Sequence, residues 1–201
     1  MTSPLHDLAE RYWDAWLAAK PLAATFLGDH RFDDQVDDLS ADAEQAQAAT
    51  WRSMLRELEG IGVDGLDDTD RVTHRLLEGE LQQLLAAIDH RLVEMASDQM
   101  AGVHADLLID GGLLSAITPD HAEMALVRVE RLSEMLDAAT VRFRSGLAAG
   151  RTPARVNVER SIHQIEGYLA SEVGDDPWVN MSGPEGWDGE EAWRAGLAER
   201  V

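Results

Sequence analysis

Apolar residues recur at spacings of three and four along almost the whole chain, and this periodicity constrains the fold more than any other feature. Such spacing places apolar side chains on one face of a helix. Sustained alternation of apolar and polar residues is nearly absent, as are Asn-Gly or Asp-Gly turns between apolar runs. The chain is therefore predicted to be all-α, an antiparallel, bundle-like array of about six to eight helices of uneven length.

Prolines, glycines and capping residues mark the expected helix ends. Residues 100–115 (MAGVHADLLIDGGLLS) interrupt the pattern and indicate a glycine-bearing connector that could hold a turn of helix. The expected boundaries are Pro21 and Gly28 around a short second helix, Ser40 before the third, Asp67 or Thr69 before the fourth, Thr118-Pro119 before a long helix and Thr152-Pro153 before the next.

The character of the sequence changes near its end. We predict a helical domain over residues 1–171 and a Gly/Pro/Trp-rich acidic connector with the start of a further helix over residues 172–201. Asp188 with Glu191 has the form of a capping box for that last helix. Because this helix stops in mid-pattern without a C-cap, the chain is expected to be a fragment of a longer protein.

The net charge of −21 argues against nucleic acid and anionic membrane surfaces as partners. The absence of cysteine excludes thiolate zinc sites and cysteine nucleophiles. Residues 1–16 lack the basic and apolar regions of a secretory signal, and the apolar runs are far shorter than a membrane span, so a cytoplasmic location is expected.

The stretch GDHRFDDQVDDLS, residues 28–40, concentrates five aspartates between Asp29 and Asp38. One hypothesis is Mg²⁺-diphosphate chemistry through Asp33 and Asp34, as in class I terpene synthases. That chemistry needs a second metal motif and a basic cavity, whereas this chain has a single lysine, Lys20. The favoured interpretation is a polar turn in which Arg31 offsets the acids and a following residue such as Ser40 caps the next helix.

Motifs for catalysis are missing from the sequence. It contains no H-E-x-x-H zinc motif, no G-x-S-x-G elbow and no phosphate-binding loop. His104-x-Asp106 and His163-x-x-Glu166 are fragments of metal-ligand patterns, and neither supplies three ligands. No catalytic residue and no metal ligand is therefore assigned.

Four segments in order nevertheless resemble a known family. They are YWDAWLAAKPLAATFLGDHRFDDQVDDLS, DRVTHRLLEGEL, QMAGVHADLL and FRSGLAAGRTPARVNVERSIHQIEGYL. In order and approximate spacing, the chain resembles the N-terminal part of the bacterial family called domain of unknown function 885.

This resemblance implies the N-terminal part of a larger helical cleft fold, similar to zinc metallopeptidases. The family's metal site, an H-E-x-x-P-G-H helix plus a later glutamate, lies beyond the matched region. The resemblance thus implies zinc only where a longer chain supplies the site, and inactivity of this chain alone. It implies two partners, the protein's own C-terminal region and a peptide substrate. Gly102, Val103 and His104 are the residues expected near that substrate.

A second hypothesis is a standalone acidic helical module that binds another protein. Its docking surface would be its acidic helix faces or the tryptophan-bearing segment from Trp178 to Trp193, which would bind a partner or a second copy of the chain. Sedimentation that shows a well-behaved monomer with a mobile tail would count against this alternative.

Overall fold

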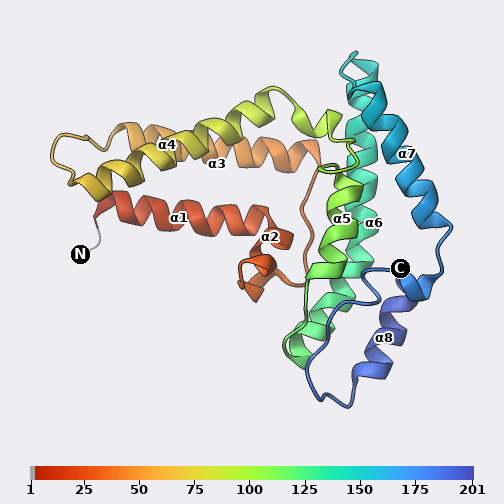
Figure 1. Ribbon diagram of the computed structural model, residues 1–201. Coiled ribbons are helices and arrows are strands. Elements are labelled where there is room, and N and C mark those ends of the chain that lie inside the picture. The colour runs from red at the N-terminus through yellow and green to blue at the C-terminus, as the bar shows by residue number, and fades with distance from the viewer. Residues whose placement is uncertain (1–2) are drawn as a thin grey trace.

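Eight α-helices and three short 3-10 helices make up the regular structure of residues 3–201, the part that the computed structural model describes (Figure 1). This arrangement confirms the all-α prediction. The α-helices are α1 (Pro4–Ala19), α2 (Pro21–Phe26), α3 (Ala41–Glu59), α4 (Asp68–Asp89), α5 (Val103–Leu113), α6 (Pro119–Ala148), α7 (Arg155–Leu169) and α8 (Glu190–Ala198). The 3-10 helices are η1 (His30–Phe32), η2 (Leu92–Met95) and η3 (Val173–Asp175).

Helices α1, α3 and α4 lie side by side and form an arm that projects from the rest of the chain (Figure 1). Its core contains Leu8 of α1, Trp51 and Leu58 of α3 and Leu81 of α4, all at most 2% exposed. Burying each large apolar side chain contributes about 1.5–3 kcal/mol, so the periodic stripes in the sequence account for the packing of the arm.

Helices α5 to α8 form a second unit, the body, in which the long helix α6 is central (Figure 1). Its separate apolar core joins Leu107 of α5 and Val129 of α6 to Trp178, Trp193 and Leu197 from the end of the chain. The ring nitrogens of the tryptophans donate to backbone carbonyls, Trp178 to Leu107 at 3.0 Å and Trp193 to Ala122 at 2.8 Å. Residues after the seventh helix therefore complete the body core.

Two buried arginines of α6 hold the body to the arm and to the segment between α2 and α3. Arg128 donates to the backbone carbonyls of Phe32 and Gln35 at 2.8 and 2.9 Å. Arg142 donates to Glu44 of α3 at 2.6 Å. The two arginines are each 3% exposed and stand about 21 Å apart along the helix, so they fix the junction at two separate points.

Glu94 in η2 lies inside a second set of ion pairs at this junction. Its carboxylate, 1% exposed, pairs with Arg91 at 3.0 Å and with Arg151, which follows α6. Burial alone would raise the pKa of Glu94, but hydrogen bonds from Arg151 and Arg91 outweigh that effect and lower it. The charged form of Glu94 is therefore part of the folded state.

The prediction of a connector with at most a turn of helix at residues 100–115 is wrong in its helix content, because residues 103–113 form the three-turn helix α5. Gly102 is the N-cap of α5. It lies so close to Asp98 that a Cβ at this position would be 2.5 Å from the backbone nitrogen of Asp98. Gly111 lies against the ring of Trp178, where a Cβ would come within 2.7 Å. These glycines thus allow close approach, and packing against the body outweighs their low helix propensity.

Local capping signals succeeded at some helix starts and failed at others. Ser40, Asp67 and Thr118 each accept a hydrogen bond from a backbone N–H of the first turn, as predicted. At α7 the N-cap is Ala154 rather than Thr152, and at α8 it is Gly189, so the predicted capping box at Asp188 does not form.

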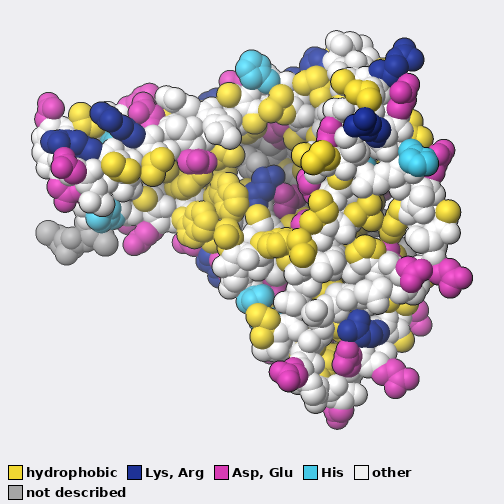
Figure 2. All heavy atoms as spheres, in the orientation of Figure 1, with side chains coloured by type: hydrophobic (Ala, Val, Ile, Leu, Met, Phe, Trp, Pro, Cys, Tyr) yellow, Lys and Arg dark blue, Asp and Glu magenta, His cyan; other side chains and the backbone are white. Residues whose placement is uncertain are grey.

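The surface carries a hollow between the arm and α5 on the face shown in Figure 2. Apolar side chains gather beside it over α1 and α2, where Trp13, Phe26 and Leu27 are about half exposed. Within residues 3–201, no helix has both the length and the apolar character required to cross a bilayer.

Candidate functional site: an apolar pocket between α5, α6 and α7

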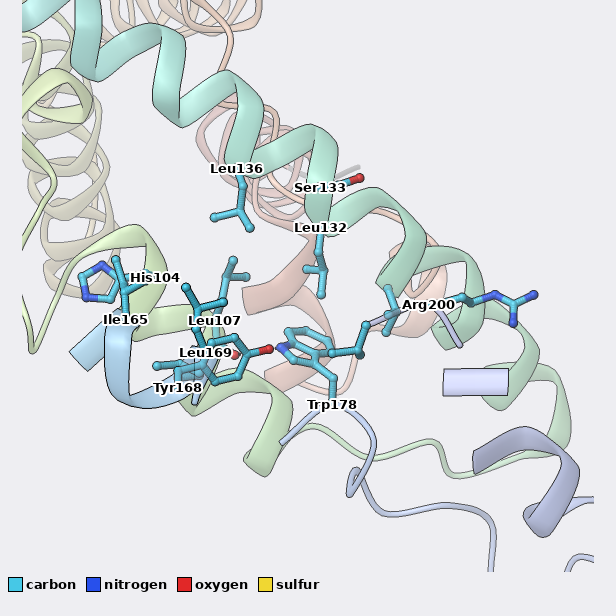
Figure 3. A pocket seen from close by; sticks show the side chains of 13 residues that line it. His104, Leu107, Leu132, Ser133, Leu136, Ile165, Tyr168, Leu169, Trp178 and Arg200 are labelled. Carbon is cyan, nitrogen blue, oxygen red and sulfur yellow. Dashed lines mark hydrogen bonds between the residues drawn. The ribbon is translucent and has the colours of Figure 1, made fainter. Parts of the chain in front are cut away.

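A pocket of about 320 Å³ opens between α5, α6, α7 and the last residues of the chain (Figure 3). Its size suits one large side chain rather than an extended ligand, since small-molecule sites usually start near 300 Å³. Apolar side chains from all three helices and from the segment after α7 form most of its wall, namely Leu107, Leu132, Leu136, Ile165, Leu169 and Trp178.

The amphipathic pattern of each helix explains why these apolar side chains remain available. Leu136, Ile165 and Leu169 are 42%, 37% and 74% exposed, although they lie on helices whose other faces are packed. Side chains three or four residues apart share one helix face, so Leu132 with Leu136, and Ile165 with Leu169, form continuous apolar strips. The two strips face each other across the pocket (Figure 3).

His104 places a polar group at the edge of the pocket. Its Nε2 lies 3.1 Å from Oε1 of Gln164 on α7, so a histidine of α5 is tied to the helix opposite. A neutral imidazole can donate from one ring nitrogen and accept at the other. With Nε2 held by Gln164, Nδ1 is the ring atom left for a ligand.

Tyr168 and Asp176 form a second polar pair at the pocket. The Tyr168 hydroxyl donates a short hydrogen bond to Oδ2 of Asp176, which is 3% exposed. Oδ1 of Asp176 accepts from the backbone N–H of Trp178 at 2.7 Å. Burial, reinforced by the Asp176 carboxylate, raises the pKa of Tyr168 to about 12. The phenol is therefore neutral at physiological pH and acts as a donor.

Of the three residues expected near substrate, His104 lines the pocket directly. Val103 packs against the body core, and Gly102 is buried against Asp98. No local sequence pattern marks the α6 and α7 walls, because their pocket residues have the same helical spacing as core residues. What distinguishes them is exposure, which depends on how the helices pack.

Two carboxyl groups of α5 lie on the side of the helix near Lys20 and Asp37. Burial, followed by repulsion from Asp106 and Asp37, raises the pKa of Asp110 to about 6. The pKa of Asp106 is also raised, chiefly by burial. Lys20 pairs with Asp37 at 3.0 Å. This group carries more negative than positive charge.

Residues 28–40 form the turn between α2 and α3 that the sequence indicated. Arg31 pairs with Asp29 and Asp14 at 2.6 and 2.9 Å, and Ser40 caps α3. Asp33 behaves differently from its neighbours, because it is buried and lies next to His30 and His121. These three side chains are the group among residues 3–201 that could hold a metal ion. Sequence reasoning assigned no metal ligand and missed this group, since His30 and His121 are far apart in the chain.

The fold and the pocket together define an all-α protein with an apolar pocket between helices. Residues 21–201 match the family described as "Bacterial protein of unknown function (DUF885)", and the chain belongs to this family. The resemblance seen in the sequence is thereby confirmed. No curated protein matches the chain in sequence.

Proposed function

We propose that this chain is the N-terminal helical part of a zinc-metallopeptidase-like protein, in which its pocket receives an apolar side chain of a peptide substrate. The observation that carries the proposal is the pocket of about 320 Å³ with its apolar wall and polar edge. Peptide side chains such as leucine and phenylalanine gain affinity by leaving water for a cavity of this character.

The polar groups at the edge suit the peptide backbone. His104, held by Gln164, offers a ring nitrogen, and the neutral Tyr168 also lines the pocket. A backbone N–H or C=O that enters an apolar site needs a hydrogen-bond partner to offset the loss of water. An apolar wall with a few polar groups therefore favours a peptide over a purely apolar ligand. No catalytic group of this chain takes part in the proposal, and a longer chain would supply the zinc site.

The proposal can be tested with two blocked dipeptides, acetyl-Phe-Leu-amide and acetyl-Asp-Ser-amide. Saturation-transfer NMR and Trp fluorescence report binding, because Trp178 lines the pocket. Since one small pocket buries few atoms, we expect a Kd on the order of 1 mM for the apolar dipeptide. The acidic dipeptide should show no saturable binding.

A matched pair of variants on α6 locates the site. Leu136→Asp adds a charge to the pocket wall and should weaken binding of the apolar dipeptide at least tenfold. Leu147→Asp makes the same change on the same helix, at a side chain that is 68% exposed and does not line the pocket. Binding that is absent in the unmodified chain, or reduced equally by both substitutions, would overturn the proposal.

The alternative of a protein-interaction module based on the tryptophan segment meets a physical obstacle. Trp178 and Trp193 are each 3% exposed and are hydrogen-bonded inside the body. A partner would have to open the body core before it could reach either ring. We therefore favour the apolar pocket as the site of recognition.

A further inference from the structure

Two histidines and one aspartate from distant parts of the chain meet where the arm joins the body. His30 lies in η1, Asp33 directly follows it, and His121 lies in the first turn of α6. One ligand atom from each side chain lies within 4.8 Å of the other two. Two imidazoles with one carboxylate form a donor set that suits divalent transition metals such as Zn²⁺.

The two oxygens of the Asp33 carboxylate face different partners. Oδ1 accepts from the Thr25 hydroxyl at 2.5 Å and lies 3.5 Å from Nη2 of Arg128. Oδ2 lies 2.7 Å from Nδ1 of His30. Metal-binding carboxylates are commonly oriented by hydrogen bonds to the oxygen that does not bind the ion. Thr25 and Arg128 orient Asp33 in this way and leave Oδ2 directed toward the histidines.

His121 provides an independent observation that the group is incomplete. Its Nδ1 is buried and has no hydrogen-bond partner within residues 3–201. Leaving a buried polar atom unsatisfied costs about 1–3 kcal/mol. The ring stacks on His30 with centroids 4.1 Å apart and planes within 19°, so it is held beside the other two ligands.

A cavity next to the group has room for one more ligand. It measures about 10 Å³ and is lined by Asp33, His121 and Ser115 among others. This volume is close to the minimum that holds one water molecule. Three protein ligands and one solvent ligand complete the four-coordinate arrangement that zinc adopts when one position is open.

We propose that His30, Asp33 and His121 bind one divalent transition-metal ion, such as Zn²⁺, together with one water molecule. Ligand atoms in a tetrahedral zinc site are about 3.4 Å apart, given bond lengths of about 2.0–2.2 Å. The His30–Asp33 separation of 2.7 Å must therefore widen slightly, and His121 must move inward. Because the two rings are stacked within 19° of parallel, at least one of them must also rotate so that the nitrogen lone pairs, which lie in the ring planes, converge on one ion.

The charge around the site also favours a cation, although Arg128 lies close to Asp33. The guanidinium of Arg128 is engaged by Thr25 and by the carbonyls of Phe32 and Gln35. Four carboxylates lie near Arg128, those of Asp33, Asp34, Asp37 and Asp110, and two of them have cations of their own, Asp34 in Arg131 and Asp37 in Lys20. Because the chain as a whole carries −21, a divalent cation approaches in an attractive field.

The site would serve the junction rather than the pocket. His30 and Asp33 belong to the turn after α2, whereas His121 begins α6, so one ion would connect this turn, which leads into α3 of the arm, to the body. It shares no residue with the lining of the apolar pocket. The inference is therefore independent of the proposed function, and either can fail without the other.

The test is a zinc titration of the full chain after removal of metal with EDTA. Competition with a chromophoric chelator gives stoichiometry and affinity, and Co²⁺ gives visible absorption that reports coordination by nitrogen and oxygen ligands. We expect one ion per chain and a rise in Tm with zinc, because an ion that binds only the folded state stabilises it.

Matched histidine variants decide whether the ion occupies this site. His121→Phe keeps an aromatic ring against His30 but removes the ligand nitrogen, so it should weaken zinc binding at least tenfold and leave the Tm in EDTA nearly unchanged. His163→Phe changes an exposed histidine of α7 and should bind zinc as the unmodified chain does. No stoichiometric binding, or equal binding by both variants, would overturn the proposal. If His121→Phe lowers the Tm in EDTA, His121→Gln supplies the same comparison with a smaller change in packing.

Discussion

Arg142 of α6 and Glu44 of α3 form an ion pair of 2.6 Å in which the two side chains are only 3% and 11% exposed. The pair joins the central helix of the body to the arm, and Arg142 also lies 3.8 Å from Glu94. Charges buried this deeply are stable only while each has a partner. The attachment of the arm therefore depends on a few side chains of α6.

Replacement of Arg142 tests this dependence. Arg142→Met leaves the buried carboxylate of Glu44 without its cation, whereas Glu94 keeps Arg91 and Arg151, so the free energy of unfolding should fall by about 3 kcal/mol. Arg144→Met on the same helix alters an exposed side chain and should change stability by less than about 0.5 kcal/mol. Urea unfolding followed by circular dichroism measures both. Similar unfolding midpoints for the two variants would show that the pair does not hold the arm.

Two adjacent glycines of α5 give a second prediction. Gly111→Ala would place a Cβ 2.7 Å from the Trp178 ring and should destabilise the fold by about 1–3 kcal/mol. Gly112→Ala has no heavy atom within 4 Å and should stabilise the helix by up to about 1 kcal/mol. Thermal unfolding monitored by Trp fluorescence should therefore shift in opposite directions for the two variants. A shift in the same direction would contradict the close approach of α5 and Trp178.

The same pair of glycines shows why the sequence predicted some elements and missed others. The caps at Ser40, Asp67 and Thr118 depend on residues within one turn, so local chemistry identified them. Whether α5 is a helix depends instead on Trp178, which packs against it from a distant part of the chain.

Part of the candidate site was likewise indicated by the sequence, and part was not. The family resemblance pointed to His104, which does line the pocket. The walls on α6 and α7, and the meeting of His30 with His121, follow only from helix packing. Side chains brought together by tertiary structure leave no spacing rule in a single sequence.

The two tyrosines of the chain give a prediction at alkaline pH. Burial, with a nearby carboxylate, raises the pKa of both Tyr12 and Tyr168 to about 12. At pH 11 fewer than about a fifth of the folded phenols should be ionised, whereas in urea most should be, because an unperturbed phenol has a pKa near 10. Absorbance at 295 nm measures the ionised fraction in the folded and in the urea-unfolded chain.

The sign of the accompanying change in stability follows from the same pKa values. A raised pKa in the folded state means that the neutral phenol is preferred there, so stability is full below about pH 10 and is lost as the pH rises toward 12. Tyr168→Phe should remove about half of the folded-state titration. Half-ionisation of the folded protein near pH 10 would contradict the burial of these hydroxyls.

Asp110 gives the last prediction, at acidic pH. Its pKa of about 6, raised by burial and then by Asp106 and Asp37, exceeds the value of about 3.9 for an unfolded chain. Between these values the folded carboxyl keeps a proton that the unfolded one releases, so its contribution to stability falls as the pH rises from about 4 to 6. Asp110→Asn removes this loss. The free energy of unfolding should be higher in the variant than in the unmodified chain, and this gain should be about 1 kcal/mol larger at pH 7 than at pH 4.5. Partial exposure of the side chain keeps the value this small. Asp137→Asn, at an exposed position of α6, serves as the control in urea unfolding at both pH values. If both variants show the same difference between the two pH values, the environment of Asp110 does not penalise its charge.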